Sequence, residues 1–280
     1  MYLRSGIPNW EGTVRLTTPS VETILEGYRL GTDQGDIAFC SVNLVQGIDD
    51  QGSLKRILID TGHVGRRPAL DQSLRQRGLT RDSIDVLFCT HAHWDHMQNL
   101  DMFPRAEVVL HPDERRYVRR PHPNDTGCPE WTDSVISRYE ERVKLAEEGT
   151  RLLPGVEVVA APGHSAGTIA LAVATADGIA IIAGDSIQNS TVARERRNAL
   201  VFWNEQQANQ SVDKLLAIGD LIYPGHDLPF RMNPDGTVEY VHDLELTITG
   251  VTPGQPGLSF AEPEFQPEIM AGVEDQRLPE

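Results

Sequence analysis

The chain has 280 residues, of which 39% are hydrophobic and 24% are charged, a composition typical of a globular protein and not of a disordered or fibrous one. Its 25 basic residues are outnumbered by 41 acidic ones, which gives a formal net charge of −16 at pH 7. This balance argues against nucleic acid or an anionic membrane as the main partner, because both require a basic face.

The cysteines and the apolar runs of the chain indicate the cellular compartment to expect. Cys40, Cys89 and Cys128 form no C-x-x-C motif and are odd in number, so a reducing compartment is the simpler interpretation. The first residues carry no apolar leader, and no run reaches the roughly 18 apolar residues of a membrane span. We therefore expect a cytoplasmic protein without a membrane partner.

The first half of the chain predicts strands, one helix and further strands. Turn signals, such as the one at 49–52, separate the early apolar runs and predict a β-meander. The expected elements are a loose arm (1–20), strand runs at 21–30, 36–48 and 54–62, a helix at 67–78, and strands at 84–90 and 106–111.

The second half begins with a Pro-rich and then charged stretch at 119–150, which predicts an insertion that covers the site as a lid. The elements expected after it are a strand running into a loop at 156–167, two strands within 169–185, a helix at 207–218 and a strand at 221–227. This pattern predicts a layered α/β or α+β fold with its chemistry on loops at strand ends. We expect one catalytic domain at 1–228, with residues 229–280 as an extension packed on it.

The segment after the strand at 84–90 carries the strongest motif, H-x-H-x-D-H. His91 and His93 lie on the same side of an extended backbone, whereas Asp95 and His96 are adjacent and point different ways. Four ionisable side chains beside an apolar strand are costly to bury without a partner. Imidazole and carboxylate are ligands that suit zinc and similar divalent ions, so the motif predicts metal binding.

Three later segments repeat one pattern, in which an apolar strand ends at a glycine followed by a ligand type. They supply His164, Asp185 and His226. Each segment alone is a weak signal, but three of them after H-x-H-x-D-H point to a binuclear site.

With these residues the sequence resembles the metallo-β-lactamase superfamily over about residues 22–228, including Leu58-Ile59-Asp60-Thr61-Gly62. The resemblance implies an αβ/βα sandwich of two mixed sheets packed face to face with helices outside. It also implies the ligand sets: His91, His93 and His164 for one metal, Asp95, His96 and His226 for the other, Asp185 as the bridge, and Asp60 as a residue that orients the ligand loop.

Such a site implies a hydrolase with two divalent ions, with Zn²⁺ favoured and Mn, Fe or Co as alternatives. A metal-bridging hydroxide would attack the carbonyl of a small carboxylic ester or lactone. Asp95 would accept a proton and pass it to the leaving group.

The motifs predict metal-dependent chemistry and leave several branches of the superfamily open. Asp185 argues against β-lactam hydrolysis, and H-x-H-x-D-H argues against a di-iron oxygen reductase. A thioesterase of the glyoxalase II kind, a mononuclear iron oxygenase and a phosphodiesterase or nuclease remain as alternatives. Many acyl-homoserine lactonases carry a tyrosine three residues after the bridging aspartate, where this chain has Gln188.

Candidate substrate contacts follow Asp185 or the Asp60 motif. They are Gln188, Asn189, Phe202, Trp203 and His63. Packing of the loop onto the helix at 207–218 is an equal alternative for Phe202 and Trp203, and a loop-stabilising hydrogen bond is one for His63. A homodimer is compatible with the Pro-rich tail.

Overall fold

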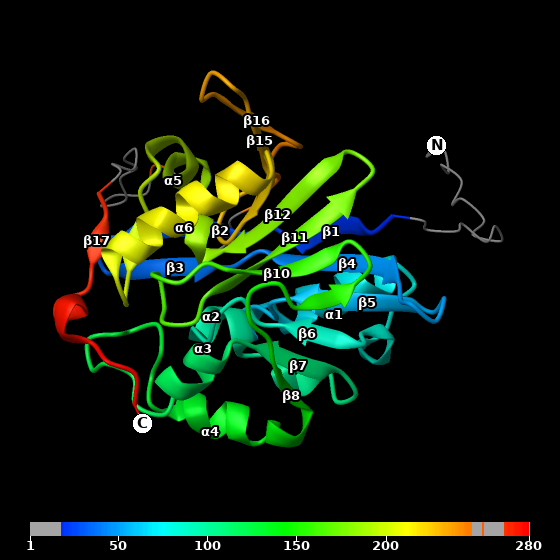
Figure 1. The fold of residues 1–280 in the computed structure, drawn as a ribbon, viewed down its shortest axis with the longest axis horizontal. Helices are drawn as coiled ribbons and strands as arrows, with labels where there is room; N and C mark the ends of the chain where they lie inside the picture. Colours follow the sequence, from blue (N-terminus) through cyan, green and yellow to red (C-terminus); the bar gives the residue numbers. More distant parts are fainter. Residues whose placement is uncertain (1–17, 248–253, 255–265, 280) are drawn as a thin grey trace.

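The structure is a computed structural model, and it describes residues 18–247, 254 and 266–279. The predicted N-terminal arm falls almost wholly outside these residues. Two mixed β-sheets pack face to face, with helices on both outer surfaces (Figure 1). This architecture confirms the predicted αβ/βα sandwich.

The sheets have six and seven strands. The first runs, in spatial order, through β1 (Ser20–Leu25), β4 (Val42–Ile48), β5 (Leu54–Ile59), β6 (Val86–Phe88), β7 (Glu107–Leu110) and β8 (Val143–Leu145). The second runs through β16 (Val238–Tyr240), β15 (Phe230–Met232), β14 (Leu221–Pro224), β12 (Gly178–Gly184), β11 (Ile169–Thr175), β10 (Val156–Ala160) and β9 (Arg151–Leu153). Two short pairs lie apart from them: β2 (Tyr28–Thr32) with β3 (Gly35–Phe39), and β13 (Leu200–Val201) with β17 (Glu268–Ile269).

Alternation along the strands separates the core between the sheets from the cores beneath the helices. Ile57 and Ile59 of β5 pack with Leu171 of the opposite sheet, whereas Leu58 packs with Leu70 and Leu74. Those two leucines belong to α1, and the helices are α1 (Arg67–Gln76), α2 (Trp94–Met97), α3 (Pro112–Tyr117), α4 (Trp131–Ser137), α5 (Ser190–Glu195) and α6 (Glu205–Ile218). Helices α5 and α6 cover the second sheet (Figure 1).

Several predicted elements are present with small shifts in their bounds. The helix at 67–78 is α1 and the helix at 207–218 is α6, and β11 turns into β12 through Ala176 and Asp177. Asn204 begins α6, because its side chain accepts a hydrogen bond from the backbone N–H of Gln207. The predicted meander is present as β1, β4 and β5. The strands β2 and β3, which come between β1 and β4 in the chain, form a separate hairpin.

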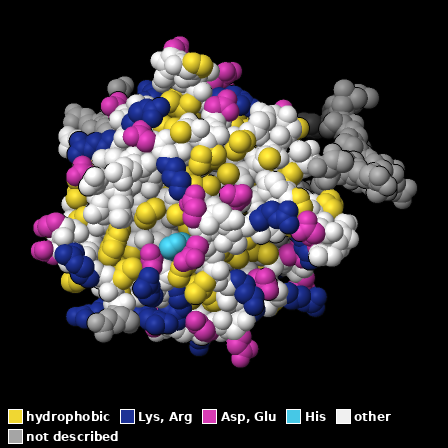
Figure 2. All heavy atoms as spheres, in the orientation of Figure 1, with side chains coloured by type: hydrophobic (Ala, Val, Ile, Leu, Met, Phe, Trp, Pro, Cys, Tyr) yellow, Lys and Arg dark blue, Asp and Glu magenta, His cyan; other side chains and the backbone are white. Residues whose placement is uncertain are grey.

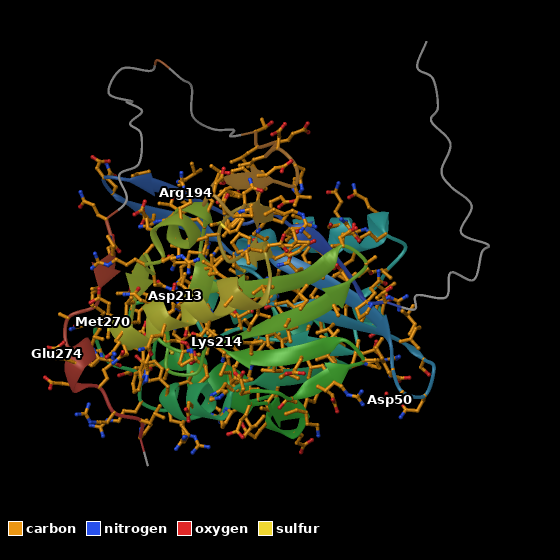
Figure 3. The ribbon with its side chains drawn as sticks, turned by 45° about the horizontal axis from the view of Figure 1, so that its top comes forward. Asp50, Arg194, Asp213, Lys214, Met270 and Glu274 are labelled. Atoms are coloured by element: carbon orange, nitrogen blue, oxygen red, sulfur yellow. The ribbon has the colours of Figure 1, made fainter. Side chains whose placement is uncertain are left out.

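Parts of the segments predicted as a lid and as a packed extension join the two sheets. Residues 143–145 of the stretch expected as a lid form β8, an edge strand of the first sheet, and the residues of that stretch that line the cleft described below are Asn124, Thr126 and Gly127. In the tail, β15 and β16 extend the second sheet. Residues 266–279 run along one side of the molecule, where Figure 3 labels Met270 and Glu274.

The surface mixes both signs of charge. Figure 2 shows Lys and Arg interspersed with Asp and Glu over one face. Among the described helices, none is long and apolar enough to cross a bilayer.

Candidate metal centre

The loops that follow four strands meet at one edge of the sandwich and bring seven side chains together. The loop after β6 and the first turn of α2 supply four of them, and the loops after β10, β12 and β14 supply one each. These are the seven residues predicted as ligands: His91, His93, Asp95, His96, His164, Asp185 and His226. Six are buried, and the ring of His226 is 10% exposed.

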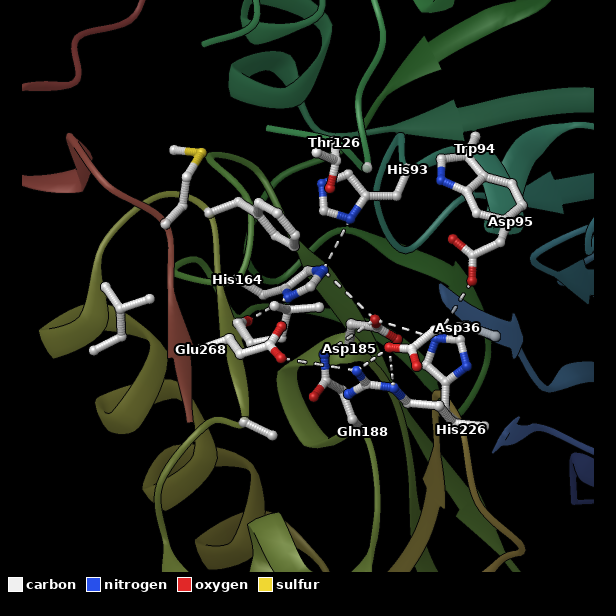
Figure 4. Close-up of a pocket in the computed structure, with 18 of the residues that line it drawn as sticks. Asp36, His93, Trp94, Asp95, Thr126, His164, Asp185, Gln188, His226 and Glu268 are labelled. Carbon is white, nitrogen blue, oxygen red and sulfur yellow. Dashed lines mark hydrogen bonds and ion pairs between the residues drawn. The ribbon is translucent and has the colours of Figure 1, made fainter. Parts of the chain in front are cut away.

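The ligand atoms form two groups that Asp185 links (Figure 4). Within each group the atoms lie no more than 4.8 Å apart, and the groups are His91, His93 and His164, and Asp95, His96 and His226. Oδ1 of Asp185 lies 3.3 Å from Nε2 of His96, and its Oδ2 lies 3.5 Å from Nε2 of His164. The carboxylate of Asp185 therefore faces both groups at once.

Unpaired atoms show that this set fits a cation. Nε2 of His91, Nε2 of His96 and Oδ1 of Asp185 are buried without a hydrogen-bond partner. Buried polar atoms are otherwise nearly always paired, because an unpaired one is costly. Imidazole nitrogens with carboxylate oxygens are the donors that zinc and related divalent ions prefer. The residues present therefore fit divalent metal ions.

Asp60 orients one of these ligands from behind. Its Oδ2 lies 2.8 Å from Nδ1 of His96, and its Oδ1 accepts a hydrogen bond of 2.8 Å from the backbone N–H of Thr90. With Nδ1 of His96 turned to the carboxylate, Nε2 is directed to the ligand group. Asp60 has a φ of +59°, a conformation uncommon outside glycine, which sets this carboxylate beneath the loop.

Asp125 stands behind His93, and no motif in the sequence singles it out. Oδ1 of Asp125 is 3.4 Å from Nε2 of His93, while Nδ1 of the same ring faces Nε2 of His164 at 3.0 Å. Tyr117 donates a hydrogen bond of 2.9 Å to the other carboxylate oxygen. The ring of His93 is therefore held so that Nδ1 is its ligand atom.

Glu114 was also missed, and it ties two ligand loops together. Its buried side chain accepts a hydrogen bond of 2.8 Å from the backbone N–H of Ala92, between two ligand histidines. The other carboxylate oxygen accepts 2.8 Å bonds from Oγ of Ser165 and the backbone N–H of Gly167, next to His164. Its segment, PDERRY, resembles an exposed helix in the sequence, so only the packing of α3 reveals the role.

Burial and neighbouring charges set the protonation of the imidazoles. Burial, followed by the neighbouring His96 and His93, lowers the pKa of His91 well below its ordinary value. Burial also lowers the pKa of His164 to about 4. Both rings are therefore neutral at pH 7, the form that binds metal.

Close packing explains why a glycine precedes the later ligands. A Cβ at Gly163 would lie 2.0 Å from the backbone nitrogen of Ala208, and one at Gly225 would lie 2.0 Å from Oδ1 of Asp185. A side chain at either position would therefore push a ligand loop away from the centre.

The family model described as "Metallo-beta-lactamase superfamily" matches residues 37–226. The chain belongs to this superfamily. It is therefore related to metal-dependent hydrolases.

Two relatives share the description "Metallo-beta-lactamase domain-containing protein 1". The one from Xenopus laevis is 30% identical over 228 residues, which is 78% of this chain and 83% of the relative. The one from Homo sapiens is 32% identical over 182 residues, 63% of this chain, and the match spans only 59% of the human protein. A solved structure of AidC, named as a dizinc quorum-quenching lactonase, aligns with a TM-score of 0.59 at 18% identity over 76% of this chain and 82% of that one, a likeness of fold.

A cleft of about 430 Å³ opens over the centre, a size within the range of small-molecule sites. Three of the five predicted substrate residues line it: Gln188, Asn189 and Phe202. The other two, His63 and Trp203, are not among its lining residues, which corrects their prediction as substrate contacts. His63 instead makes the loop-stabilising hydrogen bond given as its alternative, because its Nδ1 accepts a bond of 3.0 Å from the backbone N–H of Gly65. The half-buried ring of Trp203 packs 5.7 Å from that of Tyr117, against the core.

Two walls of the cleft lie outside the family match. Arg29 and Asp36 come from the β2–β3 hairpin, before residue 37, and form an ion pair. Residues 268–271 come from the far end of the chain, after residue 226. The family domain therefore supplies the centre, and flanking segments complete its surroundings.

Proposed function

We propose that the protein hydrolyses a carboxylic ester or lactone with two divalent metal ions, for which zinc is the best fit. The observation that carries this proposal is the convergence of seven ligand side chains in two groups that share Asp185. These side chains would hold two divalent ions, which would supply an activated water at neutral pH and a Lewis acid for the substrate carbonyl.

The chain supplies the proton transfer and the positioning. Asp95 lines the cleft, and its Oδ2 is 3.4 Å from Nε2 of His226. Its carboxylate is placed to take a proton from the attacking water and to deliver it to the leaving oxygen. Gln188 donates a hydrogen bond of 3.3 Å to Oδ2 of Asp185, and its amide has a second N–H to offer to a substrate carbonyl.

The charge of the cleft favours a neutral ester over a phosphodiester. Among its described lining residues, Arg29 is the one Lys or Arg, and Asp36 pairs with it. Phosphate backbones are bound by several such cations. AidC, which shares the fold, is named as a lactonase, and this supports the same bond class.

The test compares substrates on chelated and zinc-reconstituted protein. A γ-lactone, an aryl ester, an aryl thioester and bis(4-nitrophenyl) phosphate form the panel. We expect lactone and ester hydrolysis to be lost on chelation and restored by zinc, with two ions bound per chain. Asp185→Asn should abolish turnover, whereas Asp177→Asn, in an exposed turn, should not.

Other outcomes of the same panel would replace the proposal. Full activity without metal would remove its basis. Faster turnover of the thioester or the phosphodiester would assign the protein to those substrate classes. One bound iron with oxygen uptake would indicate an oxygenase.

A further inference from the structure

Part of the lining of the cleft is apolar. Phe202 begins this part, with its ring 4.9 Å from that of His93 and 5.5 Å from that of His164. Leu200, Ile269 and Met270 continue the same lining. We name these four residues the apolar wall. It starts at the ligand histidines and leads outward.

Hydrogen bonds fix the apolar wall in place. Strand β17 runs parallel to β13, with backbone N–H groups of Glu268 and Met270 donating 2.8 Å bonds to the carbonyls of Ala199 and Val201. Val273 is 7% exposed and packs with Val201, which anchors the segment beyond the strand. Figure 3 shows Met270 on this segment. The wall is thus a built surface held along its length.

The wall is also joined to the centre itself. Nδ1 of His164 lies 2.7 Å from the carbonyl oxygen of Leu200, so β13 orients a ligand and carries the wall at once. Charged groups adjoin the wall, because Arg29 of the hairpin pairs with Asp36 and also lies 3.9 Å from a carboxylate oxygen of Glu268, the residue before Ile269. Figure 4 shows Asp36 and Glu268 in the same cleft. A substrate at the centre therefore meets an apolar surface with a cluster of charged side chains beside it.

We propose that the apolar wall binds the acyl chain of the substrate, so that the preferred ester has an unbranched apolar acyl group. This inference rests on the proposed function. Each methylene that leaves water for such a wall should raise kcat/KM by about three- to fourfold. Leu200 and Phe202 lie within the family match and Ile269 and Met270 lie outside it, so this chain's own C-terminal segment would supply half of the wall.

The experiment measures kcat/KM for 4-nitrophenyl esters from acetate to decanoate on zinc-loaded protein. Ile269→Ser removes apolar surface from the wall. Ile179→Ser is the matched control, because Ile179 is also a strand isoleucine, is also 41% exposed, and lies outside the cleft. We expect the octanoate-to-acetate ratio to exceed tenfold in the unmodified protein and in the control, and to fall roughly three- to tenfold in Ile269→Ser. A flat profile, or the same ratio in all three proteins, would overturn the proposal.

A binding measurement separates this inference from the proposed reaction. Decanohydroxamate and acetohydroxamate share one metal-binding group and differ in chain length, and titration calorimetry gives their Kd values without turnover. Tighter binding of the longer compound by the unmodified protein and Ile179→Ser, but not by Ile269→Ser, would support the wall even if no ester were hydrolysed. Equal Kd values for both compounds would refute it.

Discussion

Glu114→Gln tests whether the tie between two ligand loops controls metal binding. The carboxylate accepts from three donors, at Ala92, Ser165 and Gly167. A glutamine keeps one oxygen, so at least one donor then faces an N–H₂ group. A hydrogen bond to a charged group contributes about 1.5–3 kcal/mol, and an unpaired buried donor costs about 1–3 kcal/mol.

We therefore expect Glu114→Gln to lose about 2–4 kcal/mol of folding free energy. Zinc affinity should fall by roughly 10- to 100-fold, as is typical when a residue behind a ligand is changed. Urea denaturation measures the first quantity, and competition with a chromogenic chelator measures the second. Glu107→Gln is the control, because it makes the same chemical change at a side chain that is 56% exposed.

The measured zinc affinity tests whether Glu114 positions the ligands. An affinity within twofold of the unmodified protein would refute the idea that Glu114 positions the ligands. If the variant does not fold, Ser165→Ala removes one of the three contacts and should give a smaller loss in the same direction.

Further predictions address other parts of the centre. Asp60→Asn should weaken zinc binding by roughly 10- to 100-fold in the same competition assay, because an amide cannot hold the Nδ1 proton of His96 and the Thr90 N–H equally well; unchanged affinity would contradict its orienting role. Gly163→Ala should cost at least about 2 kcal/mol more in urea denaturation than Gly35→Ala, because both have a φ near +130° but only the first meets neighbouring atoms; equal losses would exclude the packing argument. Zinc at 100 times its Kd should stabilise the chelated protein by about 2.7 kcal/mol per site, seen as a rise in Tm, and an unaltered Tm would show that the folded state does not bind it.

The sequence predicted single elements because they depend on local patterns. Apolar periodicity identified α1, β11, β12 and α6. Each ligand follows a strand end, but β6 lies in the first sheet and β10, β12 and β14 lie in the second, so the sandwich and the two ligand sets were predicted from the resemblance to the family. The glycine before each later ligand reflects close packing that the sequence records directly.

The rest depends on contacts that no local pattern encodes. Glu114 and Asp125 lie in short polar segments, and their partners are set by how α3 and the following loop pack onto the ligand loops. Strand β17 has two residues, too few for any periodicity, and its partner β13 is distant in the sequence. The half-buried side chain of Trp203 packs against the buried ring of Tyr117, a pairing that only the folded chain shows.

The parallel pairing of β13 with β17 separates the parts of the chain that hold metal from a part that only borders the cleft. His226 is the last of the seven ligands along the chain, and β17 begins only at Glu268. A chain shortened before Glu268 would therefore keep every ligand side chain and lose Ile269 and Met270 from the lining of the cleft.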